Sequence, residues 1–595
     1  MTEQSNRQIR ICKKSVKSTE EREQQAMSSN TGRIQGVIFA GSYFYLALPV
    51  MIFCVGWCRW YIGLPVAVAV AVSVVLCLGE YKEIFFFRKR ATECGSTEQA
   101  RLCLKTGTDR NMLQENWLRV AAVVLMVFLW VGLSGVGGYV WQNEDHAYRN
   151  AIYLLLTEQK WPLIKEIMTE SGPQGRGIVY YIGSWLPAAA AGKLLGTEAG
   201  WAVQYLWTAA GILLMYGQVC VYRKKIAVWP LVLIIFFSAP DVLGVLLGTR
   251  DTFQIFGETH LEWWPQYYQF SSVTTQLFWV YNQAVPAWLF SALLFLGEKP
   301  RNLVFLSSLM ILTSTLPFLG ILPYIIYFMI RRSVWCTEYR NVRSLWKDCL
   351  HNWGSVQNLL GGGVTAALSA VYLSGNHSMR ESLQVLNDEH RMQIFFLGMV
   401  LAMAVFWAVA TLVRKGWGRR LFRLVLAAGG AAIVWRIRNL PYEPWQSPVY
   451  YWINLTFFYA VEAGVFFCLL YPLVKDKKLF ALNGIWLYVI PLVLIGHSND
   501  FCMRASIPGL FLVMLWCIHA FDAWKRKKNN PTYRICLLAA VLALGAVTPL
   551  HEMKRSMVNT RNEYENAVAQ EDWIFTGRNF SGSTKGFFWR YIAKQ

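Results

Sequence analysis

The chain has 595 residues, of which 55% are hydrophobic and only 16% are charged, and its formal net charge is +21 at pH 7. A soluble globular chain carries about 25% charged residues, so this composition excludes an ordinary soluble protein. The basic residues stand in short clusters beside apolar runs, as in membrane proteins, and do not indicate nucleic-acid binding. Because about 20 apolar residues cross a bilayer, the sequence predicts an all-α polytopic membrane protein with about 14–15 transmembrane helices.

The N-terminal part of the chain predicts a basic tail and a membrane hairpin. Residues 1–33 are polar and basic, which is typical of a disordered cytoplasmic tail, and they do not resemble a cleavable signal peptide. Residues 34–118 contain two apolar runs, Val37–Val55 and Ile62–Leu78, followed by a basic segment. The 13 cysteines show no CxxC pairing, so the sequence predicts neither a disulfide framework nor a zinc site.

Lys and Arg favour cytoplasmic loops, so the basic segments on both sides of this hairpin place the N-terminus in the cytoplasm. The third run, Val120–Val140, then leads outward, and residues 119–550 form the predicted main transmembrane domain. If both Val179–Leu195 and Trp201–Val221 crossed the membrane, the basic cluster after Val221 would lie outside. We therefore interpret Val179–Leu195 as an amphipathic helix along the outer surface.

With that choice the later basic clusters all fall on the cytoplasmic side, and residues 551–595 become an extracytoplasmic C-terminal tail. Polar residues gather in the predicted outer loops. The loop after Val140 holds Glu144 and Asp145. The remaining candidates of this kind are Arg250, Asp251, Glu258, His260, Arg436, Arg438, Asn499, Asp500 and Arg504.

Arginine side chains at an outer membrane face suit a phosphate, which they bind bidentately. The alternative is that each arginine pairs with a local carboxylate or a lipid headgroup. The loop from Pro240 to Tyr281 also combines carboxylates with Trp and Tyr rings. That combination suits a sugar, and an interfacial aromatic belt is the alternative explanation.

The order of these segments resembles the GT-C superfamily of integral membrane glycosyltransferases, in a bacterial branch. The resemblance rests on EDHAYRNAIY after the third run, on WPLIKEIM and VYYIGSWLPAAAAGKLLG, and on WVYNQAVPAWL and SNDFCMRASIP further on. It covers roughly Val120 to Pro508. It implies a GT-C-like helical bundle with extracytoplasmic juxtamembrane helices, and it adds Asn282 and Gln283 to the substrate-binding candidates.

The resemblance implies transfer of a sugar from a polyprenyl-phosphate donor to a glycan, lipid or protein acceptor, with inversion, at the outer face of the cell membrane. Asp145 is the expected general base and Glu144 the second choice, while capping of the following helix is the alternative role of Asp145. No cofactor is firmly expected, no metal ligands are assigned, and Mg²⁺ or Mn²⁺ is left open. Besides these substrates, the expected partners are membrane lipids. A transporter or flippase, or a polysaccharide polymerase acting on lipid-linked saccharides, is the alternative function.

Overall fold

The computed structural model describes residues 31–81, 108–170, 172–247, 260–265, 268–331, 350–377, 455–493, 499–525, 532–562, 567–577 and 579–594. These residues are mostly helical, as the sequence predicts. Seven helices are long and apolar enough to cross a membrane within the described ranges: Gln35–Trp57, Trp60–Gly79, Asn116–Leu133, Thr197–Arg223, Val273–Leu296, Asp500–Lys525 and Tyr533–Arg561. Two shorter apolar helices are Thr315–Ile330 and Leu455–Leu470.

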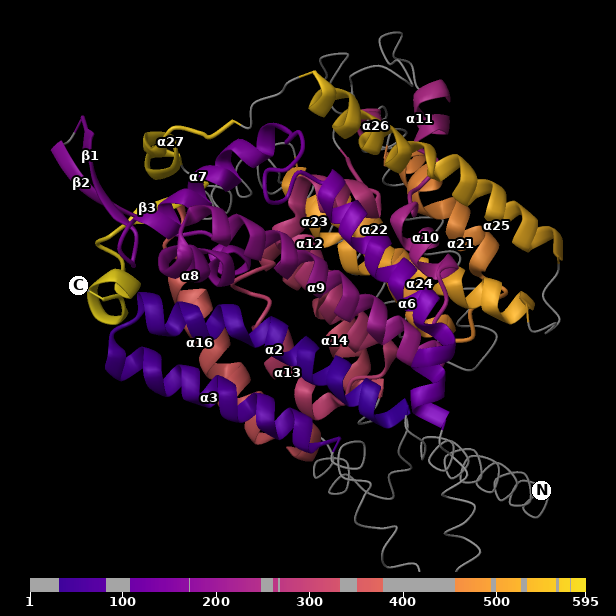
Figure 1. The fold of residues 1–595 in the computed structure, drawn as a ribbon, viewed down its shortest axis with the longest axis horizontal. Coiled ribbons are helices and arrows are strands. Elements are labelled where there is room, and N and C mark those ends of the chain that lie inside the picture. Colours follow the sequence, from indigo (N-terminus) through magenta and orange to yellow (C-terminus); the bar gives the residue numbers. More distant parts are fainter. Residues whose placement is uncertain are drawn as a thin grey trace, which may run out of the picture.

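The first half of the bundle (Figure 1) runs from α2 to α12. Its elements are α2 (Thr31–Trp57), α3 (Trp60–Gly79), α6 (Thr108–Leu133), α7 (Glu144–Glu158), β1 (Ile164–Thr169), β2 (Gly172–Ile178), η2 (Ile182–Trp185), α8 (Leu186–Leu195), α9 (Thr197–Arg223), α10 (Trp229–Ile235), α11 (Asp241–Leu247), η3 (Leu261–Trp263) and α12 (Val273–Leu296).

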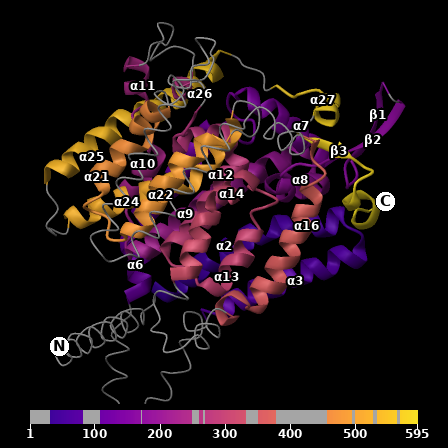
Figure 2. The ribbon, with the colours of Figure 1, turned by 180° about the vertical axis from the view of Figure 1, so that it is seen from behind.

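The second half begins with α13 (Pro300–Ser308), α14 (Thr315–Ile330), η5 (Gln357–Gly362) and α16 (Gly363–Leu373), and from behind α16 is seen beside α3 (Figure 2). It continues with η7 (Ala460–Gly464), α21 (Val465–Leu470), α22 (Lys477–Val489), η8 (Ile490–Leu492), α23 (Asp500–Ala505), α24 (Ile507–Lys525), α25 (Thr532–Gly545), α26 (Val547–Arg561), α27 (Glu571–Thr576), β3 (Ser581–Ser583) and η10 (Phe588–Ile592).

Helix α12 lies at the centre of the bundle, and 94% of its most apolar stretch is buried. It contacts α9, α14 and α24, which surround it. An aromatic contact also joins α6 to α12, where Trp130 stacks on Trp288 with 5.9 Å between ring centroids. The polar side chains Gln276, Asn282 and Gln283 of α12 are buried along with its apolar ones, so the bundle encloses α12.

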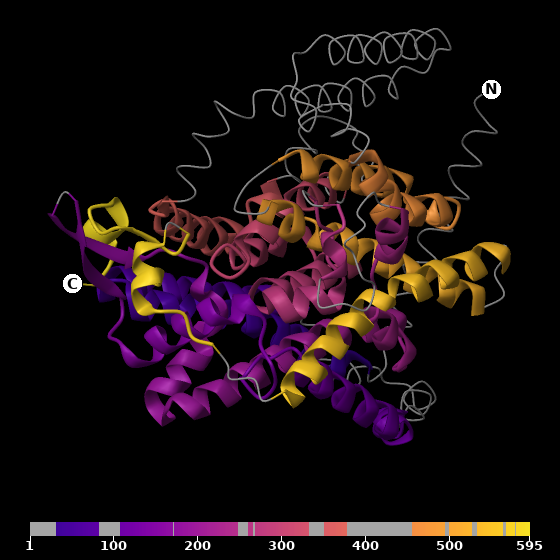
Figure 3. The ribbon, with the colours of Figure 1, turned by 90° about the horizontal axis from the view of Figure 1, so that it is seen from above.

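A small antiparallel sheet departs from the all-α prediction. Its strand order is β1-β2-β3, so the last strand comes from the C-terminal segment. That segment also contacts the turn between α2 and α3, where the amide of Arg59 donates to the carbonyl of Ile592 at 2.8 Å. The sheet, α27 and the C-terminus lie at one end of the molecule (Figure 3). The C-terminal residues predicted as a tail are therefore packed against the bundle wherever the structure describes them.

The segment Val179–Leu195 does not form a membrane-crossing helix. It contains η2 and then α8, which has 10 residues and is about 15 Å long at 1.5 Å per residue. The hydrocarbon core is about 30 Å thick. The prediction that this segment does not span the membrane is confirmed by its length.

The ion pairs in the described part of the chain follow the predicted topology. Three of them join residues that the sequence assigns to the cytoplasmic side: Glu80–Arg301, Arg223–Asp522 and Arg331–Asp476. Three others join residues assigned to the outer side: Asp145–Arg149, Lys165–Glu571 and His260–Glu552. None of these six pairs joins residues assigned to opposite sides. Which face is the outer one is still a prediction.

Candidate functional site

A break in α12 provides the anchor for the site. Val280 has a non-helical backbone (φ −141°, ψ 35°), and Pro286 lies inside the same helix. Because proline has no N–H, the carbonyl of Asn282 lacks its helical partner and accepts a hydrogen bond from the Ser184 hydroxyl instead. The carbonyl of Phe278, one turn earlier, is likewise available to side chains from other elements.

Helix α7 is attached to that carbonyl. Asn143 Nδ2 donates to the Phe278 oxygen at 2.8 Å, and His146 Nε2 lies 3.0 Å from the same oxygen. Burial, followed by the nearby charge of Arg149, lowers the pKa of His146 to about 3, so its ring is neutral at pH 7 and Nε2–H is the donor. Asn143 is the N-cap residue of α7. The alternative role of Asp145 as the helix cap is therefore wrong.

Asp145 lies in the first turn of α7 and meets basic side chains instead. Arg149 Nη2 donates to Asp145 Oδ2 at 2.7 Å, four residues along the same helix. The negative charge of Asp145 acts electrostatically on Arg504, which lies on α23. Arg504 Nη2 pairs with Asp500 Oδ1 at 3.0 Å. Two carboxylates and two arginines from distant parts of the sequence thus form one cluster, which we call the Asp145–Arg504 site.

Two tyrosines complete this site. Arg504 Nη1 donates to the Tyr181 hydroxyl at 3.1 Å, and the Tyr180 hydroxyl donates to the Tyr181 oxygen. Burial raises the pKa of Tyr180 and of Tyr181, although the charge of Arg504 acts in the opposite direction. Both hydroxyls are therefore protonated at neutral pH and can donate hydrogen bonds.

The arginines of the site are buried and incompletely bonded. The side chain of Arg149 is 9% exposed and that of Arg504 is 10% exposed. Arg149 Nη1 and Arg504 Nε have no hydrogen-bond partner among the described residues. A buried, unsatisfied N–H of a charged group costs free energy, so the site is suited to an anion. The Asp145 side chain is 41% exposed and so is accessible to a substrate.

His260 belongs to a different cluster. Its Nδ1 lies 2.8 Å from Glu552 Oε1 and its Nε2 lies 3.3 Å from Glu262 Oε2. All three side chains are buried. Burial alone would lower the pKa of His260, but the charges of Glu552 and Glu262 outweigh it and raise that pKa to about 10. Arg555 also pairs with Glu552 at 2.8 Å. We call this group the His260 cluster.

The structure distributes the predicted site residues over several places. Asp145, Asp500 and Arg504 come together, while Glu144 is exposed and Asn499 precedes α23 in a left-handed conformation (φ 58°). Asn282 and Gln283 are buried inside the bundle, where their carbonyls accept from Ser184 and Ser314. No contact among the described residues joins them to Asp145. Arg250, Asp251, Glu258, Arg436 and Arg438 lie outside the described residues.

The sequence interpretation missed four residues. Arg149 stands four positions after Asp145, a spacing at which a carboxylate and an arginine pair on a helix, so it could have been found. Tyr180 and Tyr181 were read only as the aromatic start of a surface helix. Glu552 contacts His260 across 292 positions of sequence, and no local pattern signals such a contact.

The described residues include no group of three or more His, Cys, Asp or Glu side chains placed to hold a metal ion. Comparison with known proteins adds no relative: no protein-family model, no curated protein and no solved structure matches the chain.

Proposed function

We propose that this protein is a membrane glycosyltransferase that moves a sugar from a polyprenyl-phosphate donor to a glycan, lipid or protein acceptor at the outer face of the cell membrane. The observation that carries the proposal is the Asp145–Arg504 site. It combines an accessible carboxylate with two buried arginines that have N–H groups to spare. Those are the two functions that transfer from a lipid phosphate requires.

Asp145 acts as the general base. Its carboxylate takes the proton of the acceptor hydroxyl while that oxygen forms a bond to the anomeric carbon of the sugar. The bond from the anomeric carbon to the phosphate oxygen breaks, and polyprenyl phosphate leaves with the electron pair. Arg149 Nη2, 2.7 Å from Asp145 Oδ2, donates to this carboxylate and holds it in position.

Arg149 and Arg504 bind the departing phosphate. Arginine presents several N–H donors that match phosphate oxygens, and Arg149 Nη1 and Arg504 Nε are the donors left free by the protein's own contacts in the described chain. The Tyr181 hydroxyl accepts from Arg504 and Tyr180, so its own proton is a further neutral donor beside Arg504. Such donors stabilise charge as it develops on the leaving group.

Replacing Asp145 by asparagine tests this role. A deletion strain is complemented with wild-type or D145N protein, and its cell-envelope glycans are compared by mass spectrometry. Loss of a general base lowers the rate by roughly 10²- to 10⁴-fold, so the product should disappear. The matched control is E144Q, which removes the exposed neighbouring carboxylate and should keep the product. Product at the wild-type level with folded D145N protein present would eliminate Asp145 as the base.

The alternative of a transporter or flippase for lipid-linked saccharides draws support from the His260 cluster. Titratable side chains inside a membrane bundle are typical of transport proteins, and His260, Glu262 and Glu552 are all buried. A polymerase would use the Asp145–Arg504 site with a lipid-pyrophosphate saccharide as donor.

Purified protein in detergent micelles, supplied with a lipid extract of the deletion strain, separates these functions. A transferase or polymerase forms a new glycoconjugate without a sealed membrane, and mass spectrometry of the released lipid distinguishes polyprenyl phosphate from polyprenyl pyrophosphate. A flippase forms no product in micelles and moves the saccharide only in vesicles.

A further inference from the structure

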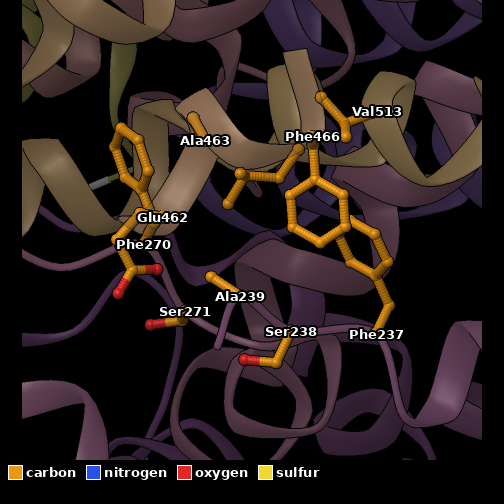
Figure 4. A pocket seen from close by; sticks show the side chains of 10 residues that line it. Phe237, Ser238, Ala239, Phe270, Ser271, Glu462, Ala463, Phe466 and Val513 are labelled. Atoms are coloured by element: carbon orange, nitrogen blue, oxygen red, sulfur yellow. The ribbon is translucent and has the colours of Figure 1, made fainter. Parts of the chain in front are cut away.

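A small cavity lies away from the Asp145–Arg504 site, between the end of α10, the π-helix η7 and α24. Its lining is divided: Glu462, Ser271 and Ser238 present oxygens at one side, while Phe466 and Phe237 close the other (Figure 4). Its free space of about 10 Å³ is enough for one water molecule or one small ion.

Two buried carboxyl groups meet beside this cavity. Asp241 is 0% exposed and Glu462 is 2% exposed. Asp241 Oδ2 accepts from Ser238 Oγ at 3.0 Å and from Thr548 Oγ1 at 2.8 Å, and Glu462 Oε1 accepts from Trp264 Nε1 at 3.1 Å. The other two oxygens, Asp241 Oδ1 and Glu462 Oε2, receive no hydrogen bond from a donor in the described chain.

The two carboxyl groups lie close enough for their charges to interact. Two carboxylate oxygens are both acceptors, so they can approach only if a proton or another positive charge lies between them. Burial raises the pKa of Asp241 to about 6, and the charge of Glu262 adds to the rise. The charge of Glu262 acts on Glu462 as well, and the thiol of Cys502 is a further titratable neighbour of Glu462.

Nearby cations do not supply the missing charge. His260 is already held between Glu262 and Glu552, and Arg555 is bound to Glu552 as well. An unpaired buried carboxylate costs a large free energy. Among the described residues no cation pairs with Asp241 or Glu462, so the pair needs a further positive charge, and the cavity is where that charge can enter.

We propose that Asp241 and Glu462 form a binding site for one monovalent positive charge, carried by a proton or by Na⁺. The cavity has room for one such ion, and the free oxygens of the pair and the serine oxygens are hard ligands of the kind that small cations prefer. Glu462 also sits in η7, Ala460–Gly464, a single π-helical turn of the kind that is frequent at functional sites. The site is independent of the proposed glycosyl transfer.

Infrared difference spectroscopy of the purified protein in lipid tests the proposal. In Na⁺-free choline buffer at neutral pH, the spectrum should contain the C=O band of one protonated carboxyl group that disappears in E462Q and in D241N. Addition of NaCl then distinguishes the two carriers. If Na⁺ occupies the site, the band is lost as Na⁺ is added, and if only a proton does, the band is unchanged by Na⁺ and lost only as the pH rises.

Glu298→Gln is the matched control, because Glu298 is also buried but accepts hydrogen bonds from Tyr43 and Asn302. It should leave the protonated-carboxyl band in place. The amide bands of each spectrum report whether the variant has kept its helices. A wild-type spectrum with no band that E462Q removes, and no response to Na⁺, would overturn the proposal.

Discussion

Replacing His260 by asparagine is expected to destabilise the protein strongly below pH 6.5 and much less at pH 10. The charges of Glu552 and Glu262 raise the pKa of His260 from 6.5 to about 10 against the effect of burial. At about 1.4 kcal/mol per pH unit, this rise corresponds to roughly 5 kcal/mol of stability. The imidazole is 1% exposed, so solvent screens little of that energy.

The sign of the effect follows from linkage between protonation and folding. The folded protein binds the His260 proton more tightly than the unfolded chain does. The stabilisation is therefore complete below pH 6.5, declines as the pH rises, and is lost once the pH passes about 10. The difference in thermal midpoint between wild type and H260N should shrink steadily over this range.

His146 is the matched control, since it is equally buried but neutral. Burial, then the charge of Arg149, lowers its pKa from 6.5 to about 3. The stability that neutral His146 contributes is lost only as the pH falls from 6.5 toward 3. The decrease in thermal midpoint caused by H146N should therefore be constant from pH 6.5 to pH 10. The 27 tryptophans provide an intrinsic fluorescence signal for thermal unfolding in detergent. If the decreases in thermal midpoint caused by H260N and by H146N depended on pH in the same way, this account of the His260 cluster would be refuted.

Two further predictions concern packing and topology. A Cβ on Gly320 would lie 2.0 Å from the carbonyl oxygen of Ala505, next to Arg504, whereas one on Gly363 would meet nothing within 4 Å. G320A should therefore lower the stability of the fold by about 1–3 kcal/mol and reduce glycan product. G363A should change neither the stability nor the product. Equal thermal midpoints for the two variants would contradict this expectation. In a background without other exposed cysteines, a membrane-impermeant thiol reagent should label a cysteine at Met168 from outside but not one at exposed Lys225. Labelling at Lys225 would reverse the predicted orientation of α9.

The sequence predicted the helical class and several membrane-crossing segments because these depend on local composition. Apolar runs of about 20 residues are evident in a sequence, and α2, α3 and α9 fall where such runs lie. Helix α12 begins at Val273, inside the segment Pro240–Tyr281 that the sequence predicted as an outer loop. The small sheet was not predictable, because β3 joins β2 from the far end of the chain. Its strands are short and lack a clear alternation of apolar and polar residues.

The candidate site was predicted in part. The sequence predicts both Asp145 and Arg504 as site residues, because each lies in a polar run beside an apolar one. It does not predict that they lie close together, since that depends on how α7 and α23 pack. The buried partners were harder to find. Glu262 stands two residues after His260, on the same loop, whereas Glu552 was assigned to a tail. Long-range packing, which no local pattern encodes, decides which of these carboxylates meets the histidine.

The broken turn of α12 connects the two polar clusters. The carbonyl of Phe278 accepts from Asn143 and lies 3.0 Å from His146, which together fix the start of α7 and so the position of Asp145. The next residue, Trp279, donates its indole N–H to Glu552 Oε2 at 3.0 Å. Two consecutive residues at the break thus serve one cluster each. The backbone carbonyl of Phe278 binds the start of α7, and the indole of Trp279 binds Glu552 of the His260 cluster. The His260 cluster and the residues that hold the proposed base in place are therefore attached to the same turn.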